Sequence, residues 1–319
     1  MNLLDKAKTY NMQLGLTFIA LLILVLFMVT APGTFLKPRI YISFLSTTPF
    51  IGIAGLGLTL VLVSGEIDLS FTAVMAFAGF VFAATMGFTG SIILGILAGL
   101  AAGSVVGMLN GLLVTLIGIP SIVVTLGMQF LIRGATNIIA AGRATTLTEI
   151  AGTPLYNLLV GEINGIIPAQ AIWFLVLAIA IWLLLFRHRF GDHILFSGDN
   201  PETAKMMGVS VTKTKILVFV VFGLLGAFAG ILDSFRLRTW WPTMGEGYLM
   251  TTMAAVFVGG TSMFGGEGTI YGTFLGAFLI GSLEAGIVAA GLSGFWTRFI
   301  YGILIIIAVT VHTLLRRRS

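Results

Sequence analysis

Residues 69–132 read LSFTAVMAFAGFVFAATMGFTGSIILGILAGLAAGSVVGMLNGLLVTLIGIPSIVVTLGMQFLI. This run of 64 residues, between Asp68 and Arg133, contains no Asp, Glu, Lys, Arg or His. A membrane-spanning helix needs about 20 apolar residues, so the run is long enough for nearly three crossings. It therefore places the chain among the membrane proteins.

The composition of the whole chain supports this class. Of its 319 residues, 58% are hydrophobic and only 9% are charged. A soluble domain has roughly 25% charged residues, so the composition excludes a soluble globular enzyme. The 41 glycines are typical of transmembrane helices that pack backbone to backbone. Because the chain has no cysteine, disulfides, thiolate metal sites and cysteine nucleophiles are also excluded.

The hydropathy pattern predicts an all-α, polytopic membrane protein with about ten spanning helices. The range is eight to eleven, because the long fourth segment and the short eighth segment could each be broken or re-entrant. No linker divides the chain, so residues 1–319 are predicted to form a single transmembrane domain. The expected spans are 14–31, 43–64, 71–88, 90–116, 121–141, 169–186, 215–234, 249–263, 269–290 and 295–314.

The basic residues predict the orientation, because they concentrate on the cytoplasmic side of membrane proteins. If both termini are cytoplasmic, ten basic residues lie inside and six lie outside. The inner ten are Lys6, Lys8, Arg187, Arg189, Lys205, Lys213, Lys215, Arg316, Arg317 and Arg318. The outer six are Lys37, Arg39, Arg143, Arg236, Arg238 and Arg298. The net charge of +5 is thus a topology signal, and no nucleic-acid partner is expected.

The two chain ends fit the same topology. The first apolar stretch has about 18 residues, longer than the apolar region of a signal peptide, and further spans follow it. We therefore expect an uncleaved first span. The terminal run Arg316-Arg317-Arg318 is expected to anchor the last span on lipid phosphates.

The longest inner polar segment, residues 187–214, contains a short helix with clear boundaries. Asn200 is a candidate N-cap, Pro201 suits the first helical position and Gly208 suits the end of the helix. Ala204 and Met207 are three residues apart and so share a face. That apolar patch could be covered by a partner protein or by the membrane domain itself.

A second glycine-rich run, residues 259–277, does not have the sequence pattern of a nucleotide-binding loop. It lacks the Gly-Lys-Ser/Thr ending that places a lysine on phosphates, and no such run occurs elsewhere in the chain. ATP hydrolysis by this polypeptide is therefore not expected. A weak internal echo links Val63-Ser64-Gly65-Glu66 with Phe264-Gly265-Gly266-Glu267. Such paired segments can mark a pseudo-symmetric transporter, although chance similarity is an equal explanation.

Taken together, these runs resemble the permease subunit of monosaccharide-type ATP-binding-cassette (ABC) importers, the ribose, galactose and arabinose family. Four blocks in family order carry the resemblance. They are Ser64-Gly65-Glu66-Ile67-Asp68-Leu69-Ser70; Pro120 to Gly127 with Arg133-Gly134; the inner loop from Arg189 to Val209, leading into Gly223 to Gly230; and Gly259-Gly260-Thr261-Ser262 to Gly276-Ala277, followed by Phe295-Trp296.

The resemblance implies a paired permease in a bacterial cytoplasmic membrane, without ATPase activity or a cofactor of its own. Its expected partners are a second permease subunit, a cytoplasmic ABC ATPase that binds the ATP, and an external solute-binding protein. The inner helix then resembles the coupling helix that enters the ATPase. The residues expected to couple to the ATPase are Asp199, Asn200, Pro201, Thr203, Ala204, Met207, Gly208 and Val209.

Polar groups inside spans are candidates for the solute path, because they are costly to leave unpaired there. The candidate path residues are Asn110, Gln129, Arg133, Asn137, Thr261 and Ser262. Asn110 lies on a glycine ridge, where a helix–helix hydrogen bond is the favoured alternative. Gln129, Arg133 and Asn137 form a stripe at four-residue steps, which suits a solute path or a polar interface equally.

Asp233 and Glu284 are two further polar candidates for the solute path inside the spans. We expect an ion pair between Arg133 and Glu284, both at mid-membrane depth, and Asp68 is expected to cap the next helix with Ser70.

The outer group Arg236, Arg238, Trp240 and Trp241 has two readings. Interfacial tryptophan usually anchors a protein in the membrane. The two arginines instead suit a docking surface for an acidic binding protein.

The leading functional hypothesis is therefore an importer permease for a monosaccharide. The alternatives are an ABC permease for nucleosides or another small polar solute, and a secondary transporter driven by an ion gradient. A membrane-embedded enzyme is the third class. It is disfavoured because the chain shows no metal-ligand spacing and no catalytic constellation of Ser, His and acid.

Overall fold

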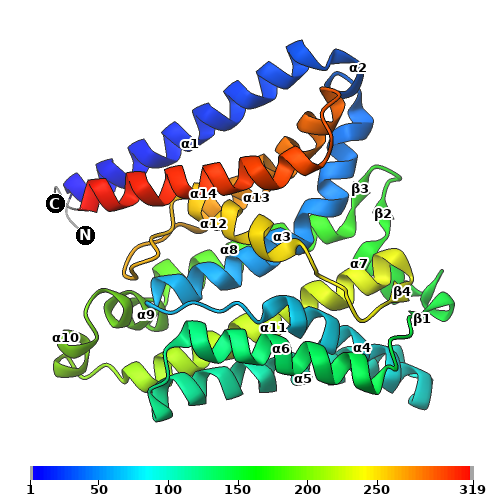
Figure 1. The fold of residues 1–319 in the computed structure, drawn as a ribbon, viewed down its shortest axis with the longest axis horizontal. Helices are drawn as coiled ribbons and strands as arrows, with labels where there is room; N and C mark the ends of the chain where they lie inside the picture. Colours follow the sequence, from blue (N-terminus) through cyan, green and yellow to red (C-terminus); the bar gives the residue numbers. More distant parts are fainter. Residues whose placement is uncertain (1–2, 317–319) are drawn as a thin grey trace.

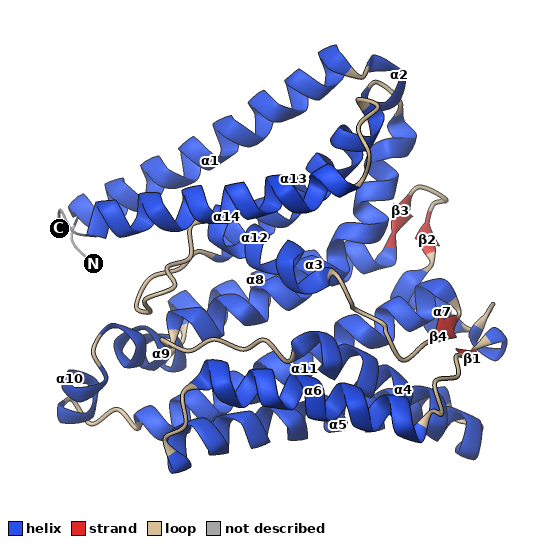
Figure 2. Ribbon diagram, viewed as in Figure 1, coloured by secondary structure: helices blue, strands red, loops and turns tan. Residues whose placement is uncertain are grey.

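The computed structural model describes residues 3–316 and consists almost entirely of helices. Strands in this described part are four two-residue pieces, so the expected all-α class is confirmed (Figures 1 and 2). The helices are α1 (Leu3–Thr30), α2 (Pro32–Phe35), α3 (Pro38–Val63), α4 (Phe71–Thr89), α5 (Ile92–Leu112), α6 (Ser121–Ile139), α7 (Pro154–Val160), α8 (Ala169–Arg187), α9 (Arg189–Asp199), α10 (Pro201–Met206), α11 (Val211–Leu237), α12 (Tyr248–Val258), α13 (Ile270–Ala289) and α14 (Phe295–Arg316).

Eight helices of the described chain are long and apolar enough to cross a membrane, within the expected range of eight to eleven. These are α1, α3, α4, α5, α6, α8, α11 and α13. The long fourth segment is unbroken, because α5 continues into a π-helical turn, Leu113–Ile117. The short eighth segment is α12, which at 11 residues is too short to span alone. The tenth segment falls in α14, whose described apolar part is Phe295–Thr310.

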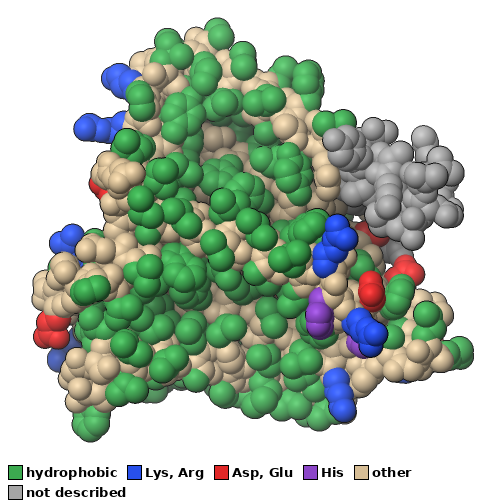
Figure 3. All heavy atoms as spheres, turned by 180° about the vertical axis from the view of Figure 1, so that it is seen from behind, with side chains coloured by type: hydrophobic (Ala, Val, Ile, Leu, Met, Phe, Trp, Pro, Cys, Tyr) green, Lys and Arg blue, Asp and Glu red, His purple; other side chains and the backbone are tan. Residues whose placement is uncertain are grey.

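The two ends of the molecule differ in their elements. Helix α1 begins and α14 ends at the end where α9 and α10 lie, whereas the small strands lie at the opposite end (Figure 1). Figure 3 shows an apolar face between two edges at which the charged side chains gather. This arrangement fits a membrane band across the middle of the helices. The terminal residues 1–2 and 317–319, with most of the terminal arginine run, lie outside the described residues.

Helix α3 forms the centre of the structure. Every residue from Thr48 to Val63 is buried, and α8, α11, α12 and α13 pack around it. Helix α1 is peripheral by comparison, with Phe18, Leu22 and Val25 all more than half exposed. The same apolar composition therefore serves a buried helix in one place and a lipid-facing helix in the other.

Helices α5 and α11 approach each other backbone to backbone. A Cβ atom added to Gly103 would lie 2.6 Å from the carbonyl oxygen of Gly223, and one added to Gly111 would lie 2.8 Å from the Cα of Ile216. Gly107 lies between them against the carbonyl of Phe219. Only glycine permits this approach, so the ridge recognised in the sequence determines which helix α5 packs on.

Two small antiparallel sheets shape the end of the molecule opposite α10. Strand β1 (Thr145–Thr146) pairs with β4 (Thr239–Trp240), and β2 (Glu162–Ile163) pairs with β3 (Ile167–Pro168). The first pairing fastens the loop after α6 to the chain just after α11. The β2–β3 hairpin leads directly into α8.

Candidate functional site

The loop between α8 and α11 contains the predicted short helix with the predicted caps. In α10, Asn200 is the N-cap, and its Oδ1 accepts a hydrogen bond from the Thr203 amide at 3.0 Å. Pro201 occupies the first helical position, and Gly208 ends the turn with φ of +83°. Before α10 the chain forms a second helix, α9, which the sequence analysis did not anticipate. Only one face of α9 packs against the rest of the protein, so many of its residues are polar and its sequence is typical of a loop.

The apolar patch on this loop differs from the expected one. Ala204 is only 1% exposed, because Val209 of the same loop and Val211, the first residue of α11, pack against it. Of the two expected coverings of this face, the protein itself covers Ala204, whereas Met207 stays exposed. The exposed apolar side chains are Met206 and Met207, at 87% and 63% exposure. An unbranched thioether side chain fills irregular gaps well, so these two residues suit a surface that a partner covers.

Behind this loop, four glycines from three segments meet in what we call the glycine junction: Gly65, Gly198, Gly265 and Gly266. The Gly266 amide donates a hydrogen bond of 2.9 Å to the carbonyl of Val63, at the end of α3. A Cβ atom added to Gly265 would lie 3.0 Å from the Cα of Gly65. One added to Gly266 would lie 2.9 Å from the Cβ of Asp199, the last residue of α9. The two glycine motifs that echo each other in the sequence are thus in direct contact.

An ion pair connects the same region to α11. Lys215 and Glu66 are 2.5 Å apart, and each side chain is only 13% exposed. Removing either partner would leave a largely buried charge unpaired, which is costly. The segment after α3 is therefore held by both the glycine junction and the first turns of α11.

Thr261 and Ser262 also lie in the loop that contributes to the glycine junction. The Ser262 amide donates to the carbonyl of Glu267, and its hydroxyl oxygen accepts from the Phe264 amide. Thr261 is 1% exposed. These two path candidates thus shape the α12–α13 loop at the end of the molecule where α9 and α10 lie.

An extended segment, residues 66–70, enters the protein between α3 and α4, and α6 satisfies its backbone. The Ile67 amide donates to Ser121 Oγ and the Leu69 amide donates to Thr125 Oγ1, both at 3.1 Å. One turn further along α6, Gln129 Oε1 accepts from the Ala73 amide at 3.1 Å. Non-helical backbone at membrane depth is tolerated only where protein groups satisfy it. The polar stripe on α6 therefore begins two steps earlier than predicted and serves a protein interface.

Asp68 and Asn110 complete this interface. Asp68 Oδ1 accepts from the amide and the hydroxyl of Ser70, at 2.7 and 2.6 Å. Ser70, the N-cap of α4, makes no side-chain hydrogen bond to the first turn of the helix, so the expected side-chain cap is not formed. Asn110, fully buried on α5, donates to Asp68 Oδ2 at 3.0 Å and to Ser70 Oγ at 2.9 Å. The Asn110 amide thus joins α5 to the N-terminus of α4, in agreement with the favoured structural reading.

The expected ion pair between Arg133 and Glu284 is wrong. Arg133 Nη1 instead donates to the carbonyls of Pro242 and Met244, at 2.7 and 2.9 Å. The reason is that the chain between β4 and α12 passes α6 with unpaired carbonyls, which a guanidinium can satisfy without a carboxylate. Asn137, the last member of the stripe, donates to the Arg133 carbonyl of its own helix.

The α6 interface predicts a specific cost for Thr125→Val. The substitution removes the acceptor of the Leu69 amide and should lower the free energy of unfolding by about 1–3 kcal/mol. Thr136→Val on the same helix is the matched control, since the Thr136 hydroxyl bonds only to the carbonyl of Ile132 in its own helix. Thermal unfolding in detergent measures both. Equal losses in the two variants would contradict the interface.

The outer aromatic and basic group is divided by the structure. Trp240 is fully buried, and its indole donates to the carbonyl of Ala76 in α4 at 2.7 Å. The Trp240 side chain points inward from β4 and packs over Gly79, so it can contact neither the membrane nor a binding protein. Arg238 remains exposed and donates to the hydroxyl of Tyr156. Trp241 is half-buried.

A comparison with known proteins decides the family. Residues 40–309 match the family described as the permease component of the branched-chain amino acid transport system. The chain belongs to this permease family. The match begins at the start of α3 and ends within α14, so it covers both the α6 interface and the loop with α9 and α10.

Individual relatives of the permease are named for sugars. It is 31% identical over 297 residues to the ribose import permease protein RbsC of Escherichia coli K12, covering 92% of each chain. It is 34% identical to RbsC of Bacillus subtilis 168, over 92% of this chain and 90% of the relative. The L-arabinose ABC transporter permease protein AraH of Azospirillum brasilense is 32% identical, over 92% and 86%. No solved structure matches the permease.

Proposed function

We propose that the permease is the membrane subunit of an ATP-driven importer that carries a monosaccharide across a bacterial cytoplasmic membrane. The observation that carries this proposal is the similarity to ribose and arabinose permeases along 92% of the chain. The eight long apolar helices and the exposed methionines beside α10 suit such a role.

The proposal includes three partners. A separate ABC ATPase binds the ATP and contacts the loop with α9 and α10, so this chain needs neither a cofactor nor catalytic residues. A second permease subunit completes the path, and an external binding protein delivers the solute. The termini and α10 lie on the cytoplasmic side, in agreement with the distribution of basic residues. Arg238 and Trp241 remain candidates for contact with the binding protein.

The glycine junction gives the proposed coupling a physical route. The end of α9 contacts both the end of α3 and the α12–α13 loop through backbone atoms. A displacement of α10 by the ATPase would therefore reach α3 and α13 without passing through flexible side chains. Lys215 and Glu66 would carry the same displacement to α11.

Reconstitution tests the proposal against an ion-gradient mechanism. The permease, its ATPase and its binding protein are placed in liposomes, and uptake of labelled D-ribose, L-arabinose and D-fructose is measured with and without ATP. We expect uptake of a sugar that requires ATP and all three proteins. Uptake by the permease alone under an ion gradient would overturn the proposal, and uptake of nucleosides but no sugar would correct the solute.

The exposed methionines give a sharper test of the ATPase contact. Met206→Glu combined with Met207→Glu places two charges on the proposed contact and should reduce co-purification of the ATPase at least about ten-fold. Glu149→Gln, an exposed substitution in the loop after β1, is the control that should leave co-purification unchanged. Normal co-purification of the methionine variant would place the ATPase contact elsewhere.

A further inference from the structure

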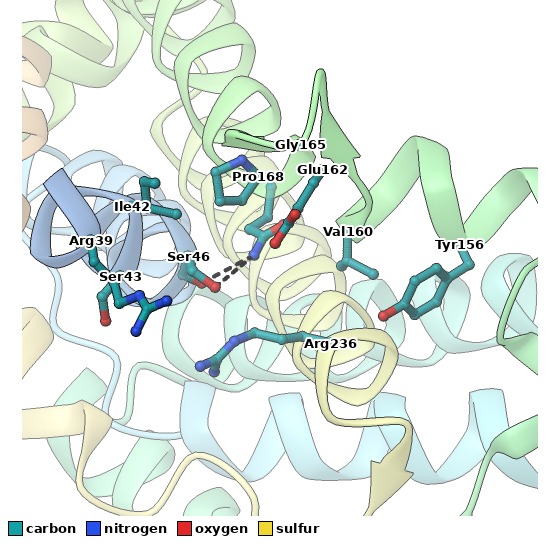
Figure 4. A pocket seen from close by; sticks show the side chains of 11 residues that line it. Arg39, Ile42, Ser43, Ser46, Tyr156, Val160, Glu162, Gly165, Pro168 and Arg236 are labelled. Atoms are coloured by element: carbon teal, nitrogen blue, oxygen red, sulfur yellow. Dashed lines mark hydrogen bonds between the residues drawn. The ribbon is translucent and has the colours of Figure 1, made fainter.

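A polar cavity of about 580 Å³ opens at the end of the molecule opposite α10. Figure 4 shows Arg39 and Ser43 of α3 on one side, Glu162 of the β2–β3 hairpin above, and Tyr156 of α7 and Arg236 of α11 opposite. Small-molecule sites commonly have volumes of about 300–1,000 Å³. The cavity is thus large enough for a monosaccharide, and it lies within one subunit.

Two charged groups in the cavity have no protein partner. Among the described residues, neither the Arg39 guanidinium nor the Glu162 carboxylate makes an ion pair or a side-chain hydrogen bond. Figure 4 shows both side chains directed toward the open space between α3 and the hairpin. The cavity therefore offers a strong donor and a strong acceptor to whatever enters it.

The charges of the cavity balance. Arg236 Nη1 lies 3.8 Å from Oδ1 of Asp233, a carboxylate of the same helix that is 1% exposed, and this ion pair offsets the charge of Arg236. Among the residues that line the cavity, Arg39 and Glu162 then leave a net charge of zero. A balanced pair favours a neutral ligand with hydroxyl groups, because each hydroxyl can both donate and accept. It disfavours a carboxylate, whether on a small acid or on an acidic protein loop.

The wall of the cavity is held in place by a buried hydrogen bond. Gln170, at the start of α8, is 2% exposed, and its Nε2 donates to the carbonyl and the hydroxyl oxygen of Ser46 at 3.2 Å. This contact connects α8, and with it the hairpin that carries Glu162, to α3. The donor and the acceptor therefore stand on elements of fixed separation.

We propose that this cavity is an entry site that binds a neutral polyhydroxylated solute of monosaccharide size, with Arg39 donating to its hydroxyls and Glu162 accepting from them. The inference rests on the proposed function, since it takes this end of the molecule as external and the solute as a sugar. The site would hold the solute within a single subunit before it reaches the path between subunits.

Thiol labelling tests occupancy directly, because the chain has no cysteine of its own. Ser43→Cys places one thiol in the exposed wall of the cavity, and Thr89→Cys at the end of α4 is the matched control outside it. A membrane-impermeant maleimide is added to intact cells or right-side-out vesicles. We expect D-ribose, L-arabinose or D-fructose to slow labelling at position 43 in a saturable manner and to leave position 89 unaffected. No protection by any of the three sugars, or no labelling from outside, would overturn the inference.

Uptake kinetics separate failure of the site from failure of the function. In the reconstituted importer, Arg39→Gln and Glu162→Gln should each raise the KM for sugar uptake about ten-fold. The controls Arg143→Gln and Glu149→Gln, exposed but outside the cavity, should leave KM unchanged. Sugar uptake with an unchanged KM in the cavity variants would overturn the entry site and leave the importer intact. Absence of all sugar uptake would overturn the proposed function, and labelling protection would still decide the site.

Discussion

Gly198→Ala is expected to reduce ATP-driven uptake at least about ten-fold while the protein still inserts into the membrane. The added Cβ would overlap the carbonyl oxygen of Val63, which accepts the Gly266 amide in the glycine junction. Overpacking of this kind costs about 1–3 kcal/mol, and here both sides of the contact are backbone, so no side-chain rotation can relieve it. The substitution therefore separates α9 from the end of α3.

The readouts for Gly198→Ala are uptake and solute-stimulated ATP hydrolysis by the reconstituted importer, with the amount of permease in the membrane measured in parallel. Gly134→Ala is the matched control, because a Cβ atom there meets no atom within 4 Å. Wild-type uptake by the Gly198 variant would show that α9 does not act through this junction.

Gly107→Leu is expected to destabilise the helix bundle by about 3 kcal/mol, at the upper end of overpacking costs. The side chain would enter the backbone of α11, where an added Cβ already lies 2.9 Å from the carbonyl carbon of Phe219 and 3.1 Å from the Cα of Val220. Thermal unfolding in detergent, followed by the loss of the monodisperse peak in size-exclusion chromatography, measures the effect.

Gly127→Leu controls for the change in composition. Gly127 lies on the exposed face of α6, and nothing is within 4 Å of an added Cβ. The midpoint of thermal unfolding of the Gly127→Leu variant should therefore stay near that of the unaltered protein. Equal midpoints for the Gly107 and Gly127 variants would contradict the close approach of α5 and α11.

The sequence predicted the positions of the helices well, because long apolar runs have few alternatives in a membrane. Each expected span falls on one helix, and the segment singled out as short is α12. The caps at Asn200 and Gly208 were also predictable, because a cap depends on the side chain and the backbone freedom of the capping residue itself. Local chemistry thus determined the elements and their ends.

The partners of buried polar groups could not be read from the sequence. Trp240 has the residue type of an interfacial anchor, yet its position in β4 depends on the space left by Gly79 on α4. For Arg133 the sequence predicted a carboxylate partner at the same depth, whereas its acceptors are backbone carbonyls. Every residue has such a carbonyl, so the sequence does not show which one accepts. One signal was available: Ser121 and Thr125 continue the stripe of Gln129 at four-residue steps, and a longer stripe favours a continuous partner.

The burial of α3 has a consequence for how the protein is made. In the finished molecule this helix is enclosed by four others from Thr48 to Val63 and scarcely meets lipid. During synthesis those neighbours are absent, since α8, α11, α12 and α13 all follow α3 in the chain. Its apolar side chains must therefore support insertion first and close packing afterwards.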